Sequence, residues 1–326
     1  MGSRFHRNLP PIAAALLSLA ALGGVILGAS VGEWGMSFQD VARAVLSGPP
    51  PGEALSGSFV VWYLRLPRTL GGFLSGVALA CAGVIFQGVF RNRLAEPYTL
   101  GVASGAAFGA AAAILLGISP SAGALAGGFA SLVLVLGLSF GAGSSGMIMS
   151  GVVVSSVLGS GLTLLKALAG EKVSAIVLWL MGSFSGATWY GVFLSLLGAL
   201  SGFCTSLGLH KELDLFASGA DPSSLGVREG VVRVLALLGA SCAAALVVGQ
   251  FGVIGFVGLV APHTMRLLLG PSCLWLSVCS ALLGGVMLVW ADVLCRMLGE
   301  MPVGVMTSLI GGPVFLWLVW RGSRDA

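Results

Sequence analysis

Long apolar runs, separated by short polar or glycine-rich stretches, dominate the pattern of the chain. An α-helix of about 20 apolar residues crosses the roughly 30 Å hydrocarbon layer of a membrane. The pattern therefore predicts ten membrane-spanning helices, near residues 11–31, 66–90, 97–117, 121–140, 146–168, 189–209, 230–250, 252–269, 274–295 and 303–320. The eighth span is the least defined, because only a glycine-containing hinge at 250–255 separates it from the seventh.

Composition places the chain in the same class. Hydrophobic residues make up 57% of the chain and charged residues 9%, which is too apolar for a soluble domain of this length. We therefore expect an all-α polytopic membrane protein with one transmembrane domain, residues 1–326. The net charge of +4 is scattered over loops and forms no basic stripe that could follow a phosphate backbone, so no nucleic-acid partner is expected.

Charge also predicts the orientation in the membrane. The first apolar run ends at Val31 and is longer than the 7–15-residue core of a cleaved signal, so we interpret it as an uncleaved span. With a cytoplasmic N-terminus, ten of the 16 basic residues face the cytoplasm, which fits the positive-inside rule with both termini inside. The basic residues left outside are Arg43, Arg65, Arg68, Lys166, Lys172 and Arg296.

Catalytic and metal-binding motifs are missing from the sequence. No Gly-Lys dipeptide occurs, so there is no phosphate-binding loop, and we expect no ATPase activity, cofactor or metal in this chain. The six cysteines form no CxxC pair and are interpreted as packed thiols. The ionisable residues of note within the spans are Lys166, His263, Arg266 and Asp292. They lie near span ends, which favours pairing or snorkelling over an ion relay.

Two polar features suggest protein partners. Arg65 and Arg68 lie three residues apart on the outer side, so on a helix they share a face, with Pro67 in the first turn. They fit docking on an acidic protein patch or ordinary snorkelling at the interface. On the inner side, residues 210–229 predict a short amphipathic helix capped by Asp221 and closed by Gly226. This segment fits a soluble partner or a solvated connector.

Glycine is abundant, with 51 residues. Glycines four apart, such as Gly101, Gly105 and Gly109, allow helices to approach closely. Gly304, Gly311 and Gly312 are expected to interrupt the last span, where backbone could line a cavity.

Four segments of the chain resemble a known family. Residues 65–106 (RLPRTLGGFLSGVALACAGVIFQGVFRNRLAEPYTLGVASGA), 212–227, 252–270 and 291–315 (ADVLCRMLGEMPVGVMTSLIGGPVF) closely resemble the permease subunits of ATP-binding-cassette (ABC) importers for iron–siderophore complexes, haem and vitamin B12. The resemblance runs along almost the whole chain. It implies ten helices with inverted repeats, in which spans two to five and seven to ten are related by a pseudo-axis in the membrane plane.

The resemblance also implies partners and their sites. Two permease copies, identical or different, would enclose the path in a bacterial or archaeal cytoplasmic membrane, with ATPase subunits that bind ATP and Mg on the inside and a periplasmic or lipid-anchored substrate-binding protein outside. Salt bridges to glutamates of the binding protein are implied for Arg65, Arg68 and Arg296. Coupling to the ATPase is implied for Ala217, Ser218, Gly219, Ala220, Asp221, Pro222, Ser223, Ser224, Leu225, Gly226, Val227 and Arg228.

The family's path is lined mainly by the fifth and tenth spans. This implies path positions at Met149, Ser150, Val153, Ser156, Thr307 and Ser308, and an inner gate at Ser144 and Ser145. An iron(III)–siderophore complex is the first choice of cargo, with haem and cobalamin open. The alternatives are an ion-coupled secondary transporter, for which Asp292 is the candidate carboxylate, and a membrane scaffold without transport.

Overall fold

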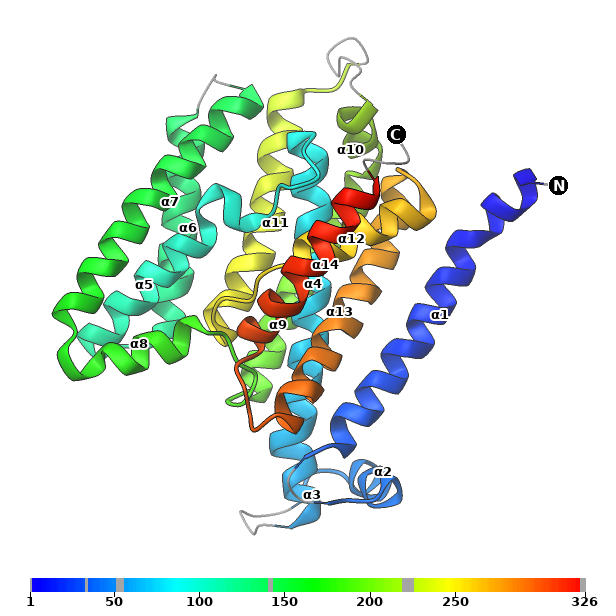
Figure 1. Ribbon diagram of the computed structural model, residues 1–326, viewed down its shortest axis with the longest axis vertical. Helices are drawn as coiled ribbons and strands as arrows, with labels where there is room; N and C mark the ends of the chain where they lie inside the picture. Colours follow the sequence, from blue (N-terminus) through cyan, green and yellow to red (C-terminus); the bar gives the residue numbers. More distant parts are fainter. Residues whose placement is uncertain (1, 33–34, 51–55, 140–142, 219–225, 323–326) are drawn as a thin grey trace.

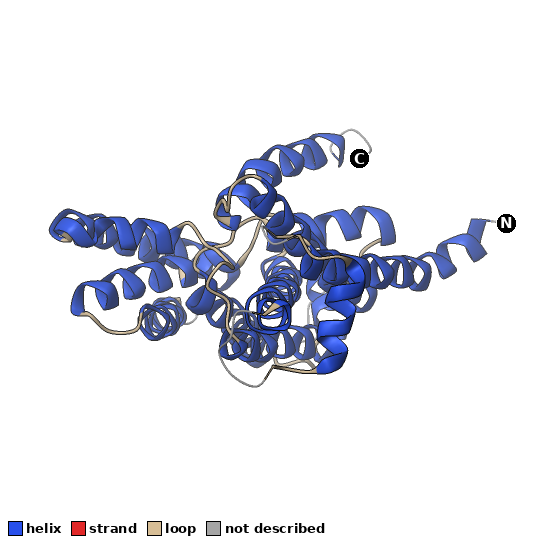
Figure 2. Cartoon of the chain, turned by 90° about the horizontal axis from the view of Figure 1, so that it is seen from below, coloured by secondary structure: helices blue, strands red, loops and turns tan. Residues whose placement is uncertain are grey.

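The computed structural model describes residues 2–32, 35–50, 56–139, 143–218 and 226–322 (Figure 1). Within these ranges every regular element is helical, and no strand is present (Figure 2). Ten helices correspond in order to the ten predicted spans: α1 (Gly2–Ser30), α4 (Leu66–Phe90), α5 (Val102–Leu116), α6 (Pro120–Leu138), α7 (Gly143–Leu168), α9 (Trp189–Gly208), α11 (Glu229–Phe251), α12 (Val257–Leu269), α13 (Cys273–Met297) and α14 (Val303–Gly322). The all-α membrane fold predicted from the sequence is confirmed.

Seven of these helices are long and apolar enough to cross a membrane, and α5, α12 and the apolar part of α14 are shorter. The remaining elements were not predicted individually: α2 (Phe38–Ser47), α3 (Gly57–Phe59), the π-helical turn η1 (Val60–Arg65), the 3₁₀ turns η2 (Pro97–Leu100) and η3 (Gly170–Lys172), α8 (Val173–Leu180) and α10 (His210–Ser218). Both termini and α10 lie at one end of the molecule, and α2 and α3 lie at the other (Figure 1). We refer to these as the α10 end and the α2 end.

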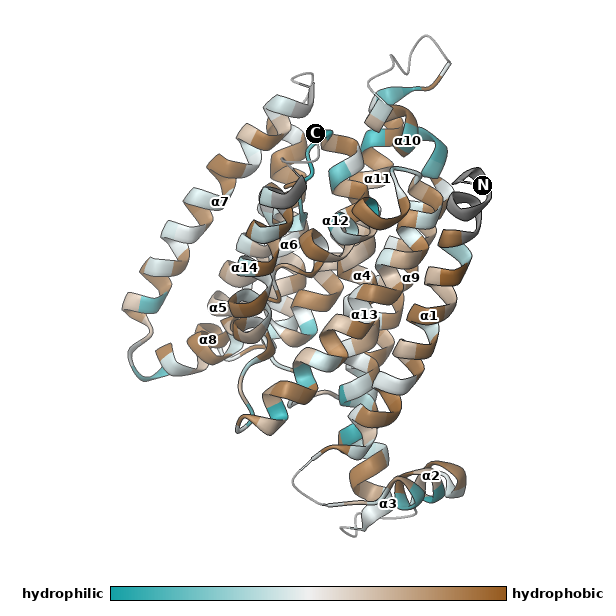
Figure 3. Cartoon of the chain, turned by 45° about the vertical axis from the view of Figure 1, so that its right-hand side comes forward, coloured by the Kyte–Doolittle hydropathy of each residue, from teal (hydrophilic) through white to brown (hydrophobic). Residues whose placement is uncertain are grey.

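At the α2 end, the short amphipathic helix α2 lies beneath the ends of the long helices (Figure 3). Ser37 and Asp40 form a capping box at the start of α2, which satisfies two backbone N–H groups that the first turn leaves without partners. Val41 and Ala44 of α2 are buried with Ala29 and Val61. This packing connects α2 to the end of α1 and to η1.

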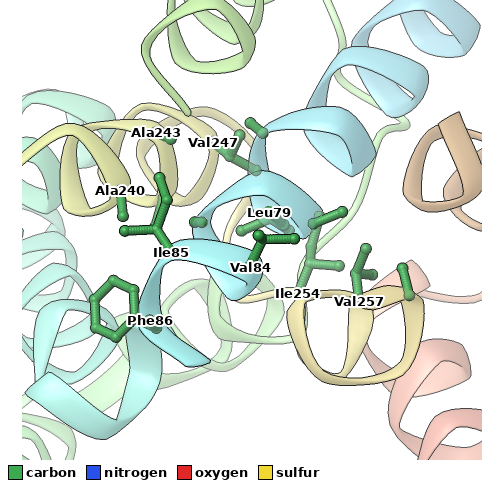
Figure 4. Packing of buried hydrophobic residues seen from close by; sticks show 14 of the residues in the cluster. Leu79, Val84, Ile85, Phe86, Ala240, Ala243, Val247, Ile254 and Val257 are labelled. Carbon is green, nitrogen blue, oxygen red and sulfur yellow. The ribbon is translucent and has the colours of Figure 1, made fainter. Parts of the chain in front are cut away.

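Helix α4 forms the centre of the bundle. It packs against α9, α11, α12 and α13, and its residues Leu79, Val84, Ile85 and Phe86 are fully or almost fully buried. Figure 4 shows this cluster with Ala240, Ala243 and Val247 of α11. The helix is inaccessible to lipid over most of its length, which explains why nearly every position on it is small or apolar.

Small residues bring the helix backbones into contact. A Cβ atom on Gly83 would lie 1.9 Å from the carbonyl oxygen of Gly258, and one on Gly109 would lie 2.1 Å from that of Gly123. The predicted close packing through glycine is confirmed at Gly109, and Gly83 makes a further contact of the same kind. The interruption expected in the last span is wrong, because α14 is continuous through Gly311 and Pro313. Instead, its glycines leave room for groups of other elements: Gly311 faces the side chain of Phe256, and Gly304 faces the carbonyls of Met181 and Val253.

Two of the spans are half-length helices. At 1.5 Å per residue, α5 with 15 residues and α12 with 13 residues extend only about 20 Å. Each starts later than the sequence indicated, after a residue in the left-handed conformation, Gly101 at φ 77° and Phe256 at φ 68°. These two N-caps occupy the third and eighth spans, the positions that an inverted repeat would pair.

The segments that lead into the half-helices contact each other. The Tyr98 hydroxyl donates a hydrogen bond to the carbonyl of Ile254 and accepts one from the Ile254 N–H at 3.2 Å. Because 156 positions separate these residues along the chain, the pair joins the two halves of the molecule. Irregular backbone of this kind is tolerated inside a membrane where protein or a cavity covers it.

Candidate docking, coupling and translocation sites

The packing of α4 on α13 gathers three arginines at the α2 end. Arg65 is the last residue of η1, Arg68 lies in the first turn of α4, and Arg296 lies in the last turn of α13. Pro67 occupies the first turn of α4, as predicted. We call Arg65, Arg68 and Arg296 the arginine cluster.

Arg68 is held by two carboxylates. Its Nε atom lies 2.9 Å and 3.1 Å from the two oxygens of Asp292, and its Nη2 atom lies 2.9 Å from Oδ1 of Asp292. The Nη1 atom lies 2.7 Å from Oε2 of Glu300. All three nitrogens of the guanidinium group therefore contact a carboxylate within the chain.

Arg296 contacts the same aspartate and the end of α1. Its Nη2 atom lies 2.7 Å from Oδ2 of Asp292, and its Nη1 atom donates hydrogen bonds to the carbonyls of Gly28 at 2.6 Å and Val31 at 2.9 Å. Asp292 is therefore clamped between Arg68 and Arg296, and its side chain is 2% exposed. Of pairing and snorkelling, the two expectations for Asp292, the structure shows pairing.

Arg65 completes the contacts with α1. It donates hydrogen bonds to the carbonyls of Ala29 at 3.2 Å and Ser30 at 2.8 Å. The last carbonyls of a helix have no partners within it, and a cation there also interacts favourably with the helix dipole. Arg65 and the side chain of Arg296 are thus buried, whereas the Arg68 side chain is 12% exposed. Arg68 is the most accessible member of the arginine cluster.

The predicted coupling residues lie at the opposite, α10 end. Ala217 and Ser218 end α10, and Gly226, Val227 and Arg228 lead into α11, with Gly226 at φ 77°. Residues 219–225, including the predicted cap Asp221, lie outside the described part of the chain.

Helix α10, which the sequence did not predict as a separate element, anchors this segment to the bundle. Leu213 and Phe216 are buried, and the Asp214 carboxylate accepts a hydrogen bond from the backbone N–H of Cys273 at 2.7 Å. A carboxylate at the first N–H groups of a helix is favourable, because those groups have no partners within the helix. The residues before the coupling segment are therefore fixed to the start of α13.

A cavity of about 690 Å³ lies next to the contact between the two half-helices. Its lining comes from the segments before α5 and α12, the end of α8 and the start of α14: Glu96, Tyr98, Leu180, Met181, Val253, Gly255, Phe256, Gly304, Val305, Ser308 and Leu309. Ser308, one of the predicted path residues, is among them. Thr307 is buried, does not line this cavity and borders a separate one of about 240 Å³; it donates a hydrogen bond to the Gly304 carbonyl at 3.1 Å.

The predicted path residues of α7 do not line this cavity. Met149, Val153 and Ser156 lie on an exposed face of α7, and Ser150 is half-buried. Of the predicted gate, Ser145 is exposed in the first turn of α7, and the side chain of Ser144 lies outside the described residues. The structure of a single chain therefore brings Ser308, but not the α7 residues, to the cavity.

Glu96 is a cavity residue that the sequence analysis missed. It lies in the connection between α4 and η2, and burial raises the pKa of its carboxyl to about 7 from an ordinary value of 4.5. The available signal was its place directly before Pro97, at the start of a predicted span. Among the described residues, no group of three His, Cys, Asp or Glu side chains could hold a metal ion.

Comparisons with known proteins agree on one family. The profile described as the FecCD transport family matches residues 19–321. The cobalamin import system permease protein BtuC of Halobacterium salinarum is 35% identical over 95% of this chain and 89% of its own length. An iron chelatin transport system permease protein of Helicobacter pylori is also 35% identical, over 95% of this chain and 96% of its own length.

Other relatives, 33–34% identical, are described as hemin, molybdate and iron(3+)-hydroxamate permeases. A solved structure described as an inward-facing conformation of a metal-chelate type ABC transporter superposes with a TM-score of 0.84. It is 31% identical and covers 96% of this chain and 99% of its own.

Proposed function

The chain belongs to the FecCD transport family as a permease subunit of an ABC importer, and we propose that it moves an iron(III)–siderophore complex or a related metal chelate into the cytoplasm. In this proposal a substrate-binding protein delivers the cargo at the α2 end, and a partner subunit hydrolyses ATP at the α10 end. The sequence itself contains no phosphate-binding loop. The permease performs no chemistry and provides the path.

The separation of the sites carries this proposal. The residues flanking the coupling segment lie at the α10 end with both termini, and the arginine cluster lies at the α2 end. The cavity near Tyr98 and Ile254 lies along the bundle between these ends. An importer driven from the cytoplasm needs this order of sites. We therefore assign the α10 end to the cytoplasm and the α2 end to the outside of the cytoplasmic membrane.

Docking of the binding protein is proposed at the arginine cluster, with Arg68 as its most accessible member. Charge complementarity between partners raises the association rate and fixes their relative orientation. Arg65 and Arg296 contribute through their position, because they fix the end of α1 and the carboxylate of Asp292 beside Arg68. An acidic side chain of the binding protein that approaches this end would meet Arg68 first.

A second permease copy is proposed to complete the path. The exposed face of α7 carries Met149, Val153 and Ser156, and small or flexible apolar residues there could pack against a partner or border the path. The path would then run between the two copies, past Ser308 and the cavity. Weakly interacting walls suit this role, because tight binding would trap the cargo.

The proposed cargo is a large chelate. Relatives of similar identity are named for different cargoes, so overall similarity does not distinguish among them. The cavity is lined mainly by apolar residues and carries the carboxyl of Glu96. No cationic side chain is among the lining residues named above to hold a small oxyanion such as molybdate, whereas apolar surface is compatible with a bulky chelate. We place iron(III)–siderophore complexes first.

The test is uptake into vesicles that contain the full chain, its cognate ATPase and its binding protein. Iron(III)–hydroxamate, haemin, cobalamin and molybdate are offered in parallel. We expect uptake of one chelate that requires ATP and the binding protein. Uptake of molybdate alone would overturn the cargo assignment, and vesicles that take up none of the four although the complex is assembled and hydrolyses ATP would contradict the chelate class.

The alternative of an ion-coupled carrier needs an accessible carboxylate within a span. Asp292, the candidate for that role, is clamped by Arg68 and Arg296 and is 2% exposed. Both of its oxygens face fixed cationic donors, so a transported ion would have to displace two arginines. This geometry favours the ATP-driven mechanism.

A further inference from the structure

Glu300 occupies the position that an acidic group of a docking protein would need in order to contact Arg68. Its carboxylate contacts the Nη1 atom of Arg68 at 2.7 Å, and its side chain is 41% exposed, whereas that of Asp292 is 2% exposed. Asp292 holds the Nε and Nη2 atoms of the same guanidinium group from inside the bundle. Of the two carboxylates, Glu300 is the one on the solvent side of Arg68.

The backbone at Glu300 is adapted to this contact. Glu300 has φ 60° and follows Gly299 at φ 87°. A left-handed conformation is unfavourable for a residue with a long side chain, and such strain persists where surrounding contacts hold it. The short connection is also held by a hydrogen bond from the Met301 N–H to the Cys295 carbonyl at 3.2 Å. The turn thus presents the Glu300 carboxylate to Arg68.

We propose that Glu300 is an internal substitute for the docking carboxylate of the binding protein, and that docking exchanges the Glu300–Arg68 ion pair for an intermolecular one. This inference rests on the proposed docking at Arg68. The buried Asp292 contact is retained during the exchange, because its release would leave buried charges unpaired, which is strongly unfavourable. The exposed Glu300 contact is weak enough to be replaced.

The exchange explains how a nearly buried arginine can serve as a docking residue. Without a partner, Glu300 neutralises Arg68 and lowers the attraction for unrelated acidic proteins. On docking, a suitably placed carboxylate of the binding protein pairs with Arg68 and compensates for the loss of the Glu300–Arg68 ion pair. The exchange also takes place next to the path, because Val303, three residues after Glu300, starts α14.

The test measures the affinity of the cognate binding protein for the assembled transporter in lipid nanodiscs at low ionic strength. E300Q keeps the size of the side chain and removes its charge. Loss of the competing ion pair is expected to lower the Kd by about twofold to fivefold, as for an exposed pair. Glu171→Gln is the matched control, because Glu171 is an exposed acid in η3 at the same end of the molecule and has no contact with Arg68 among the described ion pairs. It should change the Kd much less.

A double-mutant cycle separates exchange from long-range repulsion. If Glu300 acts through Arg68, E300Q has no effect in an R68Q background. If R68Q does not fold, the R68K background, which keeps the charge but loses the guanidinium fork, should give a smaller decrease in Kd than the Arg68 background. A decrease in Kd that persists undiminished in the background used, or that E171Q reproduces, would overturn the exchange. If R68Q weakens docking and E300Q leaves it unchanged or weaker, the exchange is wrong and docking at Arg68 stands. If R68Q folds and docks normally, both the exchange and the proposed docking site are wrong.

Discussion

Arg68 and Asp292 are 224 positions apart in the chain, and their side chains form a two-point contact in which Nε of Arg68 lies 2.9 Å and 3.1 Å from the carboxylate oxygens. Arg296 approaches the same carboxylate from the other side at 2.7 Å. The three side chains fasten the start of α4 to the end of α13. The Asp292 carboxylate is therefore the counter-charge that Arg68 and Arg296 share.

Neutralising Asp292 should destabilise the folded chain. In D292N, Arg68 and Arg296 lose their shared counter-charge, and the loss of one partner from a buried ion pair typically costs about 3–5 kcal/mol. We expect a lower midpoint of thermal unfolding in nanodiscs. E171Q, which neutralises an exposed acid at the same end, should unfold like the unmodified chain. Equal stability of D292N and E171Q would contradict the clamp.

The clamp of Asp292 between Arg68 and Arg296 could not be predicted from the sequence. The local pattern was sufficient to place Arg65, Arg68 and Arg296 at one end of their spans and to predict pairing for Asp292. It could not assign Asp292 to Arg68, because neighbours in sequence say nothing about contacts across 224 positions. Glu300 was missed for the same reason: its role depends on a left-handed turn that local composition does not specify.

Most helices could be predicted from the sequence, because a membrane requires long apolar runs whose backbone groups are satisfied within the helix. The shortened length of α5 and α12 could not be predicted. Their lead-in segments, 97–100 and 252–256, carry no charged residue, so the sequence pattern included them in the spans. What separates them is the left-handed backbone at Gly101 and Phe256, which depends on the contact between the two halves.

That contact predicts the effect of removing one hydroxyl. In Y98F, the N–H and C=O groups of Ile254 lose their shared partner, Tyr98 Oη. A buried polar group without a partner costs about 1–3 kcal/mol, so the thermal unfolding midpoint should fall. Tyr190→Phe is the matched control, since Tyr190 is 67% exposed. Equal unfolding temperatures for the two variants would contradict a stabilising contact between Tyr98 and Ile254.

Glu96 predicts a pH dependence of stability. Burial raises its pKa in the folded chain to about 7 from 4.5, so the folded state holds a proton that the unfolded state releases between these values. Stability should therefore decrease as pH rises from 4.5 to 7, by about 3 kcal/mol in total, and change little above that range. E96Q cannot ionise and should flatten the profile in chemical unfolding experiments. Identical profiles for the two proteins would exclude Glu96 as the source.

The contact between Gly83 of α4 and Gly258 of α12 predicts a strong effect from one methyl group. In G83A the new Cβ would lie 1.9 Å from the carbonyl oxygen of Gly258. Because this neighbour is a backbone atom, the clash can be relieved only if the helix backbones move apart. We expect separation of α4 from α12, with poor folding or loss of uptake. In Gly159→Ala the methyl group meets nothing within 4 Å, and alanine favours a helix by about 1 kcal/mol over glycine, so this variant should be at least as stable as the parent. Normal uptake by G83A would contradict the packing.

In the proposed mechanism, ATP hydrolysis at the α10 end drives cargo passage, and an ion gradient does not. The most direct measurement is cargo uptake into vesicles that hold the permease, its ATPase and its binding protein, with ATP or a non-hydrolysable analogue inside the ATPase compartment, with and without a protonophore. We expect uptake that requires hydrolysable ATP and persists when the protonophore collapses the gradient. Uptake that proceeds without ATP and stops with the protonophore would contradict the account.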